Sequence, residues 1–534
     1  MTEQITCGEA LIQLLEQYGV DTVFGIPGVH TLDLYRGLAN SPIRHVQARN
    51  EQGAGFMADG YARASGKPGV CVLITGPGVT NASTPLGQSF ADSIPVLLIS
   101  STNASFTLGK GWGCLHEITD QQAVTRPLTA LSATALAPED LPELIGQAFS
   151  IFASERPRPV HIAIPIDVLA EITSGGGAPR TMPSRPRANP EDVQAAAELL
   201  RTAKRPLIIA GGGAVEAQAE VTGLAERLNA VVVTTCAGKG VMPEPHPLNL
   251  GGSLVRPEVQ RFLPSADVVL AVGTELAETD SFVERLDLAG QLIRIDLDRS
   301  KLNDLHPADL GIVADAKPTL ASLLDGLGDE ASVAEDRSGA LASLRADIRA
   351  NLTDSEKQHS RLLELLRSLV PEDTIFAGDS CQLVYTGIFV MPVQQPRLWD
   401  YPAGYCTLGC GLPSGIGAKL ALPKQPVVVL AGDGGFMFTV QELVTAAELE
   451  LPLPIILWNN SGLKQIRDDM NAREIPPIGV DGPNPDFVAL AHACNGKGVL
   501  VQSQAEFTTV LEQAWHTPTF TLIEVREGDA WLTR

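Results

Sequence analysis

The sequence predicts an α/β protein with three doubly wound parallel-sheet domains, and three observations carry this prediction. The chain has 534 residues, which at about 100–200 residues per domain suggests about three domains. Short β-branched runs alternate with helical patterns throughout, which is typical of parallel sheets with crossover helices. Two stretches resemble linkers, the Gly/Pro/Ser/Arg-rich Ser174–Pro190 and the small, acidic Gly326–Ser338. They divide the chain into segments 1–173, 190–325 and 355–534.

Each predicted element rests on its pattern of apolar residues. Runs of about four to eight β-branched or apolar residues indicate buried strands, and apolar residues that recur every three or four positions indicate helices. The first segment is expected to hold helices Gly8–Tyr18 and Glu51–Ala64 and strands Thr22–Phe24, Val70–Thr75 and Pro95–Ser100. The second is expected to hold strands Pro206–Ala210, Ala230–Thr234, Val268–Val272 and Leu292–Asp296. The third is expected to hold strands Thr374–Ala377, Val427–Leu430 and Pro454–Trp458, with helix Gln441–Leu449 between the last two.

Composition excludes several classes of protein. Apolar residues make up 44% and charged residues 19%, which is too apolar for a disordered chain. With 39 Lys plus Arg and 62 Asp plus Glu, the net charge is −23, so neither nucleic acid nor an anionic membrane is an expected partner. The eight cysteines lack metal-ligand spacing, and the N-terminus lacks the basic and apolar regions of a signal peptide. We therefore expect a soluble, cytoplasmic protein without a membrane span.

The strongest group of candidate site residues lies around Asp433 and Asn460. The apolar run Val427–Ala431 leads into Gly-Asp-Gly-Gly, and after a helix the run Pro454–Trp458 leads into Asn-Asn. Such a βαβ unit places both polar residues at the carboxyl ends of two parallel strands, where open α/β sheets bind ligands. Either turn alone would be an ordinary strand-end loop, but the pair at this spacing is more specific.

The residue types in these turns suit a metal-bound phosphate. The carboxylate of Asp433, the amide oxygen of Asn460 and the backbone carbonyl of Gly462 are hard oxygen ligands of the kind that Mg²⁺ prefers. Gly434 and Gly435 leave backbone N–H groups that a phosphate can approach. The sequence therefore predicts a magnesium and phosphate site.

The G-D-G and N-N pair resembles the thiamine diphosphate motif of the thiamine-dependent decarboxylase and acetolactate synthase superfamily. The stretch Arg49–Arg63 resembles a second motif of that superfamily, H-E-Q/N-G-A-x-x-M-A-x-G-Y-A-R. The resemblance implies that Glu51 contacts N1′ of the aminopyrimidine ring and activates the cofactor. A glutamate at a helix start could otherwise serve the helix dipole alone. Many relatives have histidine at the position of Asn50, and this departure concerns substrate contacts rather than cofactor activation.

Two further segments resemble loops of the same superfamily. Tyr405–Pro413 resembles G-x-M-G-x-x-L-P, which implies that Leu408 supports the bent cofactor. The Cys406 carbonyl and the Leu408 N–H would then grip the aminopyrimidine edge. Asp379 to Gln382 matches the other loop on the diphosphate side.

The resemblance covers nearly the whole chain and implies pyrimidine-binding, central and diphosphate-binding domains. In this superfamily the two end domains, which here hold Glu51 and Asp433, build each site between two subunits. The resemblance therefore implies a homodimer at least, with a homotetramer expected.

Several polar residues are candidates for contact with the reacting carbon. His30 falls where some relatives, including benzaldehyde lyase, have a site histidine, and an imidazole there can move protons at neutral pH. It could instead be a loop histidine in solvent. Gln121 falls where relatives place a pocket glutamine. His116 and Glu117 belong either to the pocket or to a surface loop.

The subfamily that the chain resembles is 5-guanidino-2-oxopentanoate (2-ketoarginine) decarboxylase, through Gly25–Leu38, Ala48–Asn81 and Leu115–Gln121. A guanidinium substrate needs an acidic partner. The acidic candidates are Glu117, Asp120, Asp468 and Asp469. The basic residues that would favour an anionic substrate tail instead are Lys110, Lys464 and Arg467.

The expected activity is thiamine diphosphate- and Mg²⁺-dependent, non-oxidative decarboxylation of a small-molecule 2-oxo acid to an aldehyde, with His30 or His116 assisting protonation. Acetolactate synthase-like carboligation, an aldehyde ligase or lyase, and a cofactor-binding protein without turnover are the alternatives, and Glu51 disfavours the last. FAD is not expected, because Ala210–Ala214 follows a strand without a GxGxxG motif or an acidic residue placed for a ribose.

Overall fold

The structure, a computed structural model, describes residues 4–175, 177–328 and 332–533. The chain forms two compact units. Unit 1 comprises Met1–Ser184, Tyr405–Val501 and Ala505–Val525, and unit 2 comprises Arg185–Gly404, Gln502–Gln504 and Arg526–Arg534.

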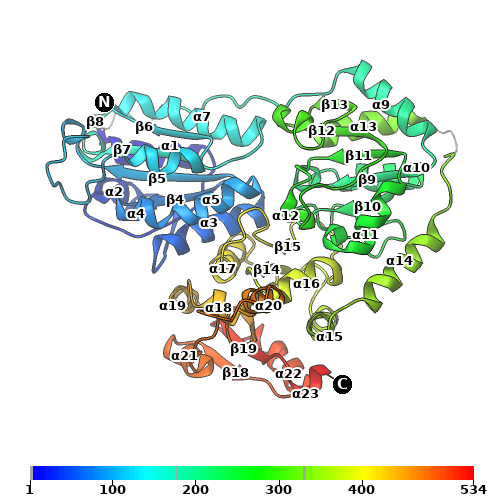
Figure 1. Cartoon of the computed structure of the whole chain (residues 1–534). Helices are drawn as coiled ribbons and strands as arrows, with labels where there is room; N and C mark the ends of the chain where they lie inside the picture. Colours follow the sequence, from blue (N-terminus) through cyan, green and yellow to red (C-terminus); the bar gives the residue numbers. More distant parts are fainter. Residues whose placement is uncertain (1–3, 176, 329–331, 534) are drawn as a thin grey trace. The chain divides into compact units, whose positions relative to one another are not determined.

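The N-terminal part of unit 1 is built on a parallel sheet of six strands in the order β3-β2-β4-β5-β7-β6 (blue and cyan in Figure 1). The strands are β2 (Thr22–Gly25), β3 (Arg44–Gln47), β4 (Gly69–Leu73), β5 (Val96–Thr102), β6 (Leu131–Thr134) and β7 (Val160–Pro165). The helices are α1 (Cys7–Gln17), α2 (Leu32–Ala39), α3 (Glu51–Ser65), α4 (Pro77–Asn81), α5 (Ser83–Asp92), α6 (Gln121–Thr125), α7 (Leu141–Ser154) and α8 (Ile166–Leu169). A short antiparallel pair, β1 (Ile5–Thr6) and β8 (Ile172–Thr173), completes this domain.

Strand β4 shows why helices cover both faces of this sheet. Successive side chains of a strand point to opposite faces. Val70 and Val72 belong to the hydrophobic cluster that includes residues of α1 and α7. Cys71 lies between them and directs its Sγ to the carbonyl of Ala54 in α3, at 3.5 Å.

The C-terminal part of unit 1 holds strands of the third sheet. Within this unit the strand order is β16-β17-β19-β18, and the pairs β16 with β17 and β18 with β19 are parallel. The strands are β16 (Val427–Gly432), β17 (Pro454–Asn459), β18 (Lys497–Leu500) and β19 (Thr521–Arg526). The helices are α17 (Gly411–Ala421), α18 (Asp433–Phe436), α19 (Glu442–Glu448), α20 (Lys464–Ala472), α21 (Phe487–Ala493) and α22 (Gln504–Ala514).

Helices α3 and α17 approach each other closely inside unit 1. A Cβ added to Gly60 would lie 2.2 Å from the Ser414 carbonyl oxygen, and one added to Gly417 would lie 2.0 Å from that of Met57. Only glycine allows two backbones to come this near. Because α3 begins at Glu51 and α17 follows Cys406, this packing unites two of the predicted cofactor motifs in one compact unit.

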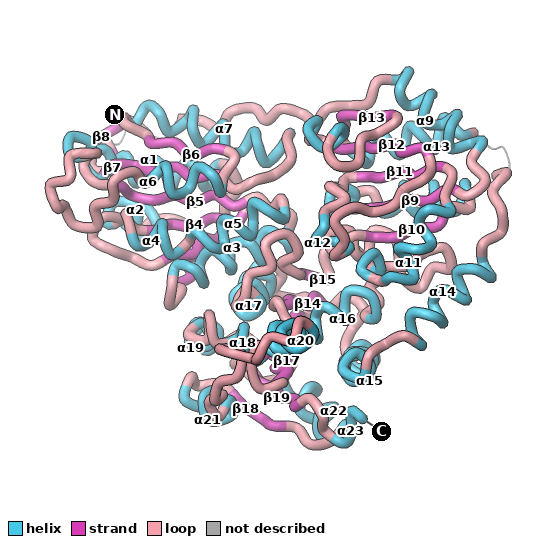
Figure 2. The backbone as a smooth tube through the Cα atoms, viewed as in Figure 1, coloured by secondary structure: helices cyan, strands magenta, loops and turns pink. Residues whose placement is uncertain are grey.

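Unit 2 contains a second parallel sheet, of five strands in the order β10-β9-β11-β12-β13. The strands are β9 (Pro206–Ala210), β10 (Val231–Thr234), β11 (Val268–Val272), β12 (Gln291–Asp296) and β13 (Leu310–Val313). Ile208 and Ala210 belong to one hydrophobic cluster, whereas Leu207 and Ile209 belong to another. The two clusters follow from the alternation of side chains across the sheet, and Figure 2 shows its strands flanked by helices.

The other elements of unit 2 are its helices and the first strands of the third sheet. The helices are α9 (Pro190–Thr202), α10 (Gln218–Leu228), α11 (Pro257–Phe262), α12 (Glu278–Ser281), α13 (Ala316–Leu327), α14 (Ser338–Ala350), α15 (Asp354–Leu369), α16 (Gln382–Val390) and α23 (Ala530–Thr533). Strands β14 (Ile375–Gly378) and β15 (Trp399–Asp400) pair in parallel.

The prediction of three parallel-sheet α/β domains is confirmed. Strands β9 and β11 have the predicted bounds, and β4 ends at Leu73, two residues before the predicted end. Of the linker residues, Gly176 and 329–331 lie outside the described residues, while Pro190 already begins α9. In the parts of the chain that the structure describes, none of the helices combines the length and hydropathy that a membrane span needs.

Candidate active site

The predicted pocket residue His30 lies at the carboxyl ends of three adjacent strands, together with residues that were not predicted to belong to the pocket. His30 lies in the loop after β2, Thr75 and Gly76 follow β4, and Ser101 lies near the end of β5. This edge is where open parallel sheets bind ligands. The topology therefore brings together residues that are far apart in the sequence.

The two candidate histidines lie side by side here. The ring centroids of His30 and His116 are 5.3 Å apart, with the rings edge to face. Nδ1 of His30 lies 3.0 Å from Oγ1 of Thr75. Burial lowers the pKa of His30, and the neighbouring His116 lowers it further, so His30 is neutral at neutral pH.

The loop that carries His116 is held in an unusual conformation. His116 has a positive φ of 59°, and a Cβ on Gly76 would lie 2.4 Å from its carbonyl oxygen. The carboxylate of Glu117 accepts hydrogen bonds from four backbone N–H groups, those of Gly111, Trp112, Gly113 and Cys114. Burial alone would raise the pKa of Glu117, but these four donors outweigh it and lower the pKa. Glu117 therefore shapes the His116 loop.

Gln121 is buried behind this loop. Its Oε1 accepts a hydrogen bond from the Gly76 N–H at 2.9 Å, and its Nε2 donates to Ser100 Oγ at 3.0 Å and to the Ser101 carbonyl at 2.9 Å. Both hydrogens of the Gln121 amide are thus used in hydrogen bonds within the protein. This geometry suits a residue that holds the turn after β4 in place.

A buried histidine that the sequence analysis did not single out extends this network. His161 in β7 is fully buried, with Nε2 2.7 Å from Ser100 Oγ and Nδ1 2.7 Å from Thr125 Oγ1. Burial lowers the pKa of His161 to about 3. No sequence motif marks His161, because it joins this network only through the position of β7 in the sheet, two strands away from β4.

The stability of the first domain should fall in mild acid because of His161. The folded pKa of about 3 lies below the ordinary value of 6.5, so the unfolded chain binds more protons and stability drops as pH falls below about 6.5. The loss between pH 7.5 and pH 5 should be about 2 kcal/mol. Thermal unfolding at both pH values should show a smaller difference for His161→Gln than for wild type. The exposed His492→Gln should behave as wild type, and an unchanged pH dependence in His161→Gln would contradict the assignment.

Glu51 is the first residue of α3, and its surroundings orient it. Asn50 is the N-cap of α3, and its side chain accepts a hydrogen bond from the Gln52 N–H at 2.9 Å. The amide of Asn81 donates to Oε2 of Glu51 at 2.9 Å. The residue that departs from the family motif is therefore a helix cap, and Glu51 keeps one carboxylate oxygen tied to α4.

A second buried carboxylate, Glu442, supports the start of α3. Its Oε1 accepts hydrogen bonds from the backbone N–H groups of Arg49 and Asn50, both at 3.1 Å. It is fully buried, and burial raises its pKa despite these bonds. Glu442 lies at the start of α19, so only the packing within unit 1 reveals this contact.

The loop that the resemblance assigns to the aminopyrimidine is anchored by a buried glutamine. Cys406 has a positive φ of 54°, an unfavourable conformation for a residue with a side chain. The next residue, Thr407, donates from its N–H (3.2 Å) and its hydroxyl (2.9 Å) to Oε1 of Gln88. These two hydrogen bonds fix the backbone of Thr407 and thereby the conformation of the loop that contains Cys406 and Leu408.

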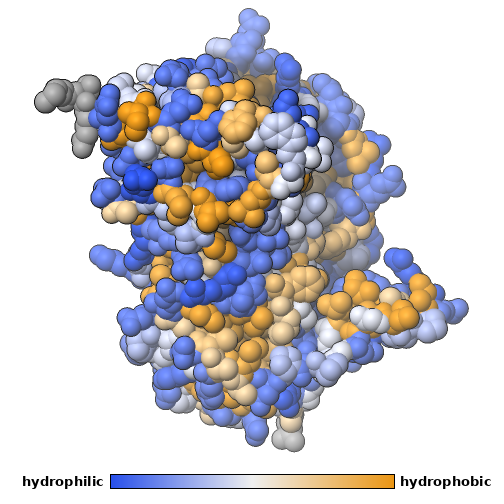
Figure 3. Space-filling view, turned by 90° about the vertical axis from the view of Figure 1, so that its left-hand side faces the viewer, coloured by the Kyte–Doolittle hydropathy of each residue, from blue (hydrophilic) through white to orange (hydrophobic). Residues whose placement is uncertain are grey.

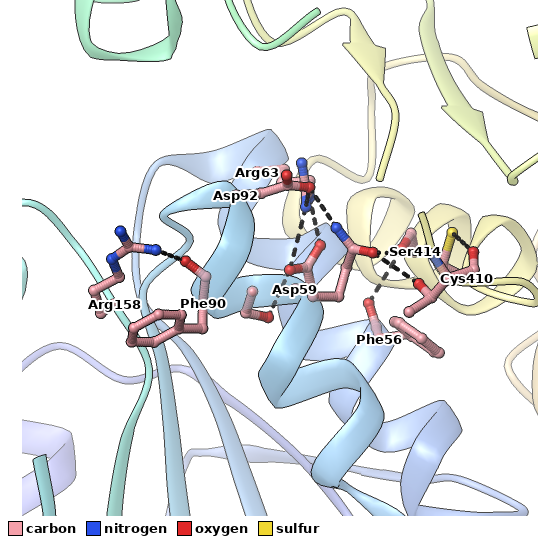
Figure 4. Close-up of polar contacts among 11 residues, drawn as sticks. Phe56, Asp59, Arg63, Phe90, Asp92, Arg158, Cys410 and Ser414 are labelled. Carbon is pink, nitrogen blue, oxygen red and sulfur yellow. Dashed lines mark hydrogen bonds and ion pairs between the residues drawn. The ribbon is translucent and has the colours of Figure 1, made fainter. Parts of the chain in front are cut away.

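A charge network in turn holds Gln88. Its Nε2 donates to Asp92 at 2.7 Å, and Arg63 bridges Asp92 and Asp59. Figure 4 shows Arg63 with Asp59 and Asp92 beside the segment of Cys410 and Ser414. The anchor of the cofactor loop therefore extends from α5 to α3.

Replacing Gln88 by leucine should weaken thiamine diphosphate binding about tenfold, because two buried donors of Thr407 lose their acceptor. Titration of tryptophan fluorescence with the cofactor at saturating Mg²⁺ measures this. Gln147→Ala, on the exposed face of α7, is the control. Wild-type affinity in Gln88→Leu would show that the anchor does not matter for binding.

Asp433 lies where β16 passes into α18, and it is almost fully buried. Its carboxylate accepts hydrogen bonds from the N–H groups of Asn460 (3.3 Å) and Gly462 (2.8 Å). The amide of Asn484, which the sequence analysis missed, donates to the same carboxylate at 2.7 Å. The βαβ geometry thus brings Asp433, Asn460 and Gly462 together.

The donor set of this corner fits Mg²⁺. The carbonyl oxygen of Gly462 lies 3.6 Å from the position of a Cβ on Gly434, so it faces the Asp433 turn. Carboxylate, amide and carbonyl oxygens are hard ligands, and Mg²⁺ takes its remaining ligands from phosphate and water. Across residues 4–175, 177–328 and 332–533, no three His, Cys, Asp or Glu side chains gather as an all-protein metal site.

The other predicted diphosphate-side residues lie in unit 2. Asp379 follows β14 and is buried, and its carboxylate accepts the Ser380 N–H at 2.7 Å. Gln382 is the first residue of α16. Both therefore occupy the end of a parallel strand and the start of the next helix.

The acidic candidates for a guanidinium partner are all engaged within the chain. Besides Glu117, Asp120 caps α6 by accepting the Ala123 N–H at 3.0 Å. Asp468 forms an ion pair with Lys464 at 2.7 Å, and Asp469 accepts from the Gln465 amide at 3.3 Å. Of these interactions, the partly exposed ion pair between Lys464 and Asp468 on α20 contributes the least free energy, so Asp468 is the acidic candidate that is most easily released to a substrate.

Three family models match the chain and define its class. They are the N-terminal TPP-binding domain (residues 5–124), the central domain (193–323) and the C-terminal TPP-binding domain (380–525) of thiamine pyrophosphate enzymes. The chain belongs to the thiamine pyrophosphate-dependent enzymes.

Among curated proteins, the chain is 52% identical to the probable 2-ketoarginine decarboxylase AruI of Pseudomonas aeruginosa, over 98% of this chain and 95% of that protein. It is 33% identical to the acetolactate synthase isozyme 1 large subunit of Escherichia coli, over 86% and 83%. It is 32% identical to the probable acetolactate synthase large subunit of Methanocaldococcus jannaschii, over 95% and 89%.

Proposed function

We propose that this enzyme catalyses the thiamine diphosphate- and Mg²⁺-dependent, non-oxidative decarboxylation of a 2-oxo acid to an aldehyde, with 5-guanidino-2-oxopentanoate as substrate. The observation that carries the proposal is the 52% identity, along nearly the full length, with a probable 2-ketoarginine decarboxylase. The pair of histidines at the carboxyl edge of the first sheet supports it, because aldehyde release requires a proton donor.

Each part of the candidate site has a role in this proposal. When bound, thiamine diphosphate supplies the nucleophilic carbon and accepts the electron pair left when carbon dioxide departs. Asp433, Asn460 and Gly462 would hold Mg²⁺, with the backbone of Gly434 and Gly435 beside the diphosphate. The resemblance to the superfamily also assigns Asp379 and Gln382 to the diphosphate.

The remaining residues would act on the pyrimidine and the substrate. Glu51 would hold a proton at the aminopyrimidine, and the Cys406–Leu408 loop would orient that ring. His30 or His116 would deliver the proton that completes the aldehyde. Gln121 would keep the turn next to them in place.

The alternative is carboligation of two 2-oxo acids, which the names of the acetolactate synthase relatives favour. Mass spectrometry of products separates the two. The purified protein with thiamine diphosphate and Mg²⁺ receives 5-guanidino-2-oxopentanoate or pyruvate. We expect 4-guanidinobutanal from the first and little acetolactate from the second. Acetolactate from pyruvate alone would overturn the proposal in favour of a synthase.

We also propose that the functional protein is a homodimer at least, with a homotetramer expected. Large apolar side chains in the loops and helix start around the histidines, Val29, Leu32, Phe106, Trp112 and Leu115, are 58–66% exposed. Apolar surface of this kind marks interaction sites, and Figure 3 shows apolar residues, in orange, on the face that it displays. Light scattering during size-exclusion chromatography tests the subunit number, and a monomer at working concentration would contradict it.

The central domain is proposed to have a structural role rather than to bind FAD. In a dinucleotide-binding turn the backbone N–H groups face the pyrophosphate. Here the N–H groups of Gly211 and Gly213 donate to the carbonyls of Val272 and Gly273, at 2.9 and 3.0 Å. An absorbance spectrum with a flavin band in the purified protein would contradict this assignment.

A further inference from the structure

Two buried hydroxyl groups lie beneath His30. Thr75 and Ser101 are both fully buried, at the ends of the adjacent strands β4 and β5. The backbone N–H of Thr75 donates to Ser101 Oγ at 3.1 Å, and its hydroxyl donates to the same oxygen at 3.0 Å. Nδ1 of His30 contacts the Thr75 hydroxyl oxygen at 3.0 Å.

Counting hydrogens determines the direction of the contact with His30. A threonine hydroxyl has one hydrogen to donate and two lone pairs to accept with. The hydrogen of Thr75 is used on Ser101. The contact between Thr75 and His30 can then be a hydrogen bond only if Nδ1 of His30 carries the proton and donates it.

We propose that Thr75 and Ser101 are positioning residues that hold neutral His30 as its Nδ1–H tautomer, which leaves Nε2 as the proton-accepting nitrogen. The proposal deepens the proposed function and rests on it for its catalytic meaning. Burial lowers the pKa of His30 and keeps the ring neutral, which a tautomer preference requires.

The chemical consequence concerns which nitrogen can move a proton. The hydrogen bond made by one ring nitrogen sets the protonation of the other. With Nδ1 committed to Thr75, only Nε2 can take up a proton from solvent and deliver it to the reacting carbon. A ring locked in this state exchanges protons through one nitrogen without losing its orientation.

The test reads the tautomer directly. Solid-state ¹⁵N NMR of the full-length protein, labelled with ring-¹⁵N histidine, distinguishes protonated from unprotonated ring nitrogens. His30→Asn identifies the His30 signals by difference. In wild type at neutral pH we expect a protonated Nδ1 and an unprotonated Nε2. A His30 signal with protonated Nε2 would overturn the proposal.

Three variants separate positioning from folding. Ser101→Ala does not touch His30 but frees the Thr75 hydrogen, so Nδ1 can accept it and the Nε2–H tautomer should become populated. Thr75→Val removes the acceptor with little change in shape and should give a mixture of tautomers. Thr75→Ser keeps the hydroxyl and should retain the wild-type signals. Wild-type signals in both Ser101→Ala and Thr75→Val would also overturn the proposal.

Activity provides a second, separable readout. If His30 moves a proton in the reaction, kcat of Thr75→Val should fall about tenfold. This loss is smaller than the about 100-fold or more that a positioned acid or base supplies, because the histidine itself is still present. KM should change little, and Thr75→Ser should restore kcat. The expected tautomer shifts without a loss of kcat would leave the positioning intact and show that the proposed catalytic role of His30 is wrong.

Discussion

Replacing Glu51 by glutamine should lower turnover at least about 100-fold while the protein still binds thiamine diphosphate. A positioned acid–base group contributes about 10²–10⁴-fold to rate, and glutamine has the same size without the exchangeable carboxyl proton. Steady-state decarboxylation measures the loss. Exchange of the cofactor's C2 proton, followed by NMR, should slow in parallel.

Glu143→Gln is a matched control, because Glu143 also lies in the first turn of a helix of this domain, α7, where its carboxylate accepts a hydrogen bond from the exposed Gln147 side chain. It should behave as wild type. Near wild-type turnover in Glu51→Gln would show that another group activates the cofactor. Loss of cofactor binding in the same variant would instead give Glu51 a binding role.

Removing the Asp433 carboxylate should strongly weaken the binding of thiamine diphosphate together with Mg²⁺. Asp433 is buried, and the loss of one partner of a buried charge contact costs about 3–5 kcal/mol. We therefore expect at least about 100-fold weaker binding of thiamine diphosphate with Mg²⁺ in Asp433→Asn. Asparagine keeps the size of the side chain, and isothermal titration calorimetry at several Mg²⁺ concentrations measures the affinity.

Asp354→Asn is the control for the loss of one negative charge, because the Asp354 side chain is 95% exposed and forms a surface ion pair with Lys357. Its cofactor affinity should equal that of wild type. Asp433→Asn binding the cofactor with unchanged affinity and unchanged Mg²⁺ dependence would mean that the metal site lies elsewhere.

Local patterns predicted much of the fold. The apolar runs of β9 and β11 predicted the first and last residue of each strand correctly, because the runs are short, rich in β-branched residues and bounded by turn residues. Strands β6 and β18, with polar and half-buried residues, were not predicted, since a weak run becomes a strand only by pairing with a neighbour. The turns that hold Asp433 and Asn460 could be located because each follows a strand with a strong signal.

The sequence by itself determined the class of enzyme, the three parallel sheets and the motifs at their strand ends, because these depend on residues close together in the chain. Only the tertiary structure decided which distant groups support those motifs. Gln88 anchors the Cys406 loop across 319 positions of sequence, and Glu442 holds the start of α3. The hydroxyls beneath His30 become neighbours through the pairing of β4 with β5. Such contacts depend on how helices and strands pack, and a pattern read along the chain does not contain that information.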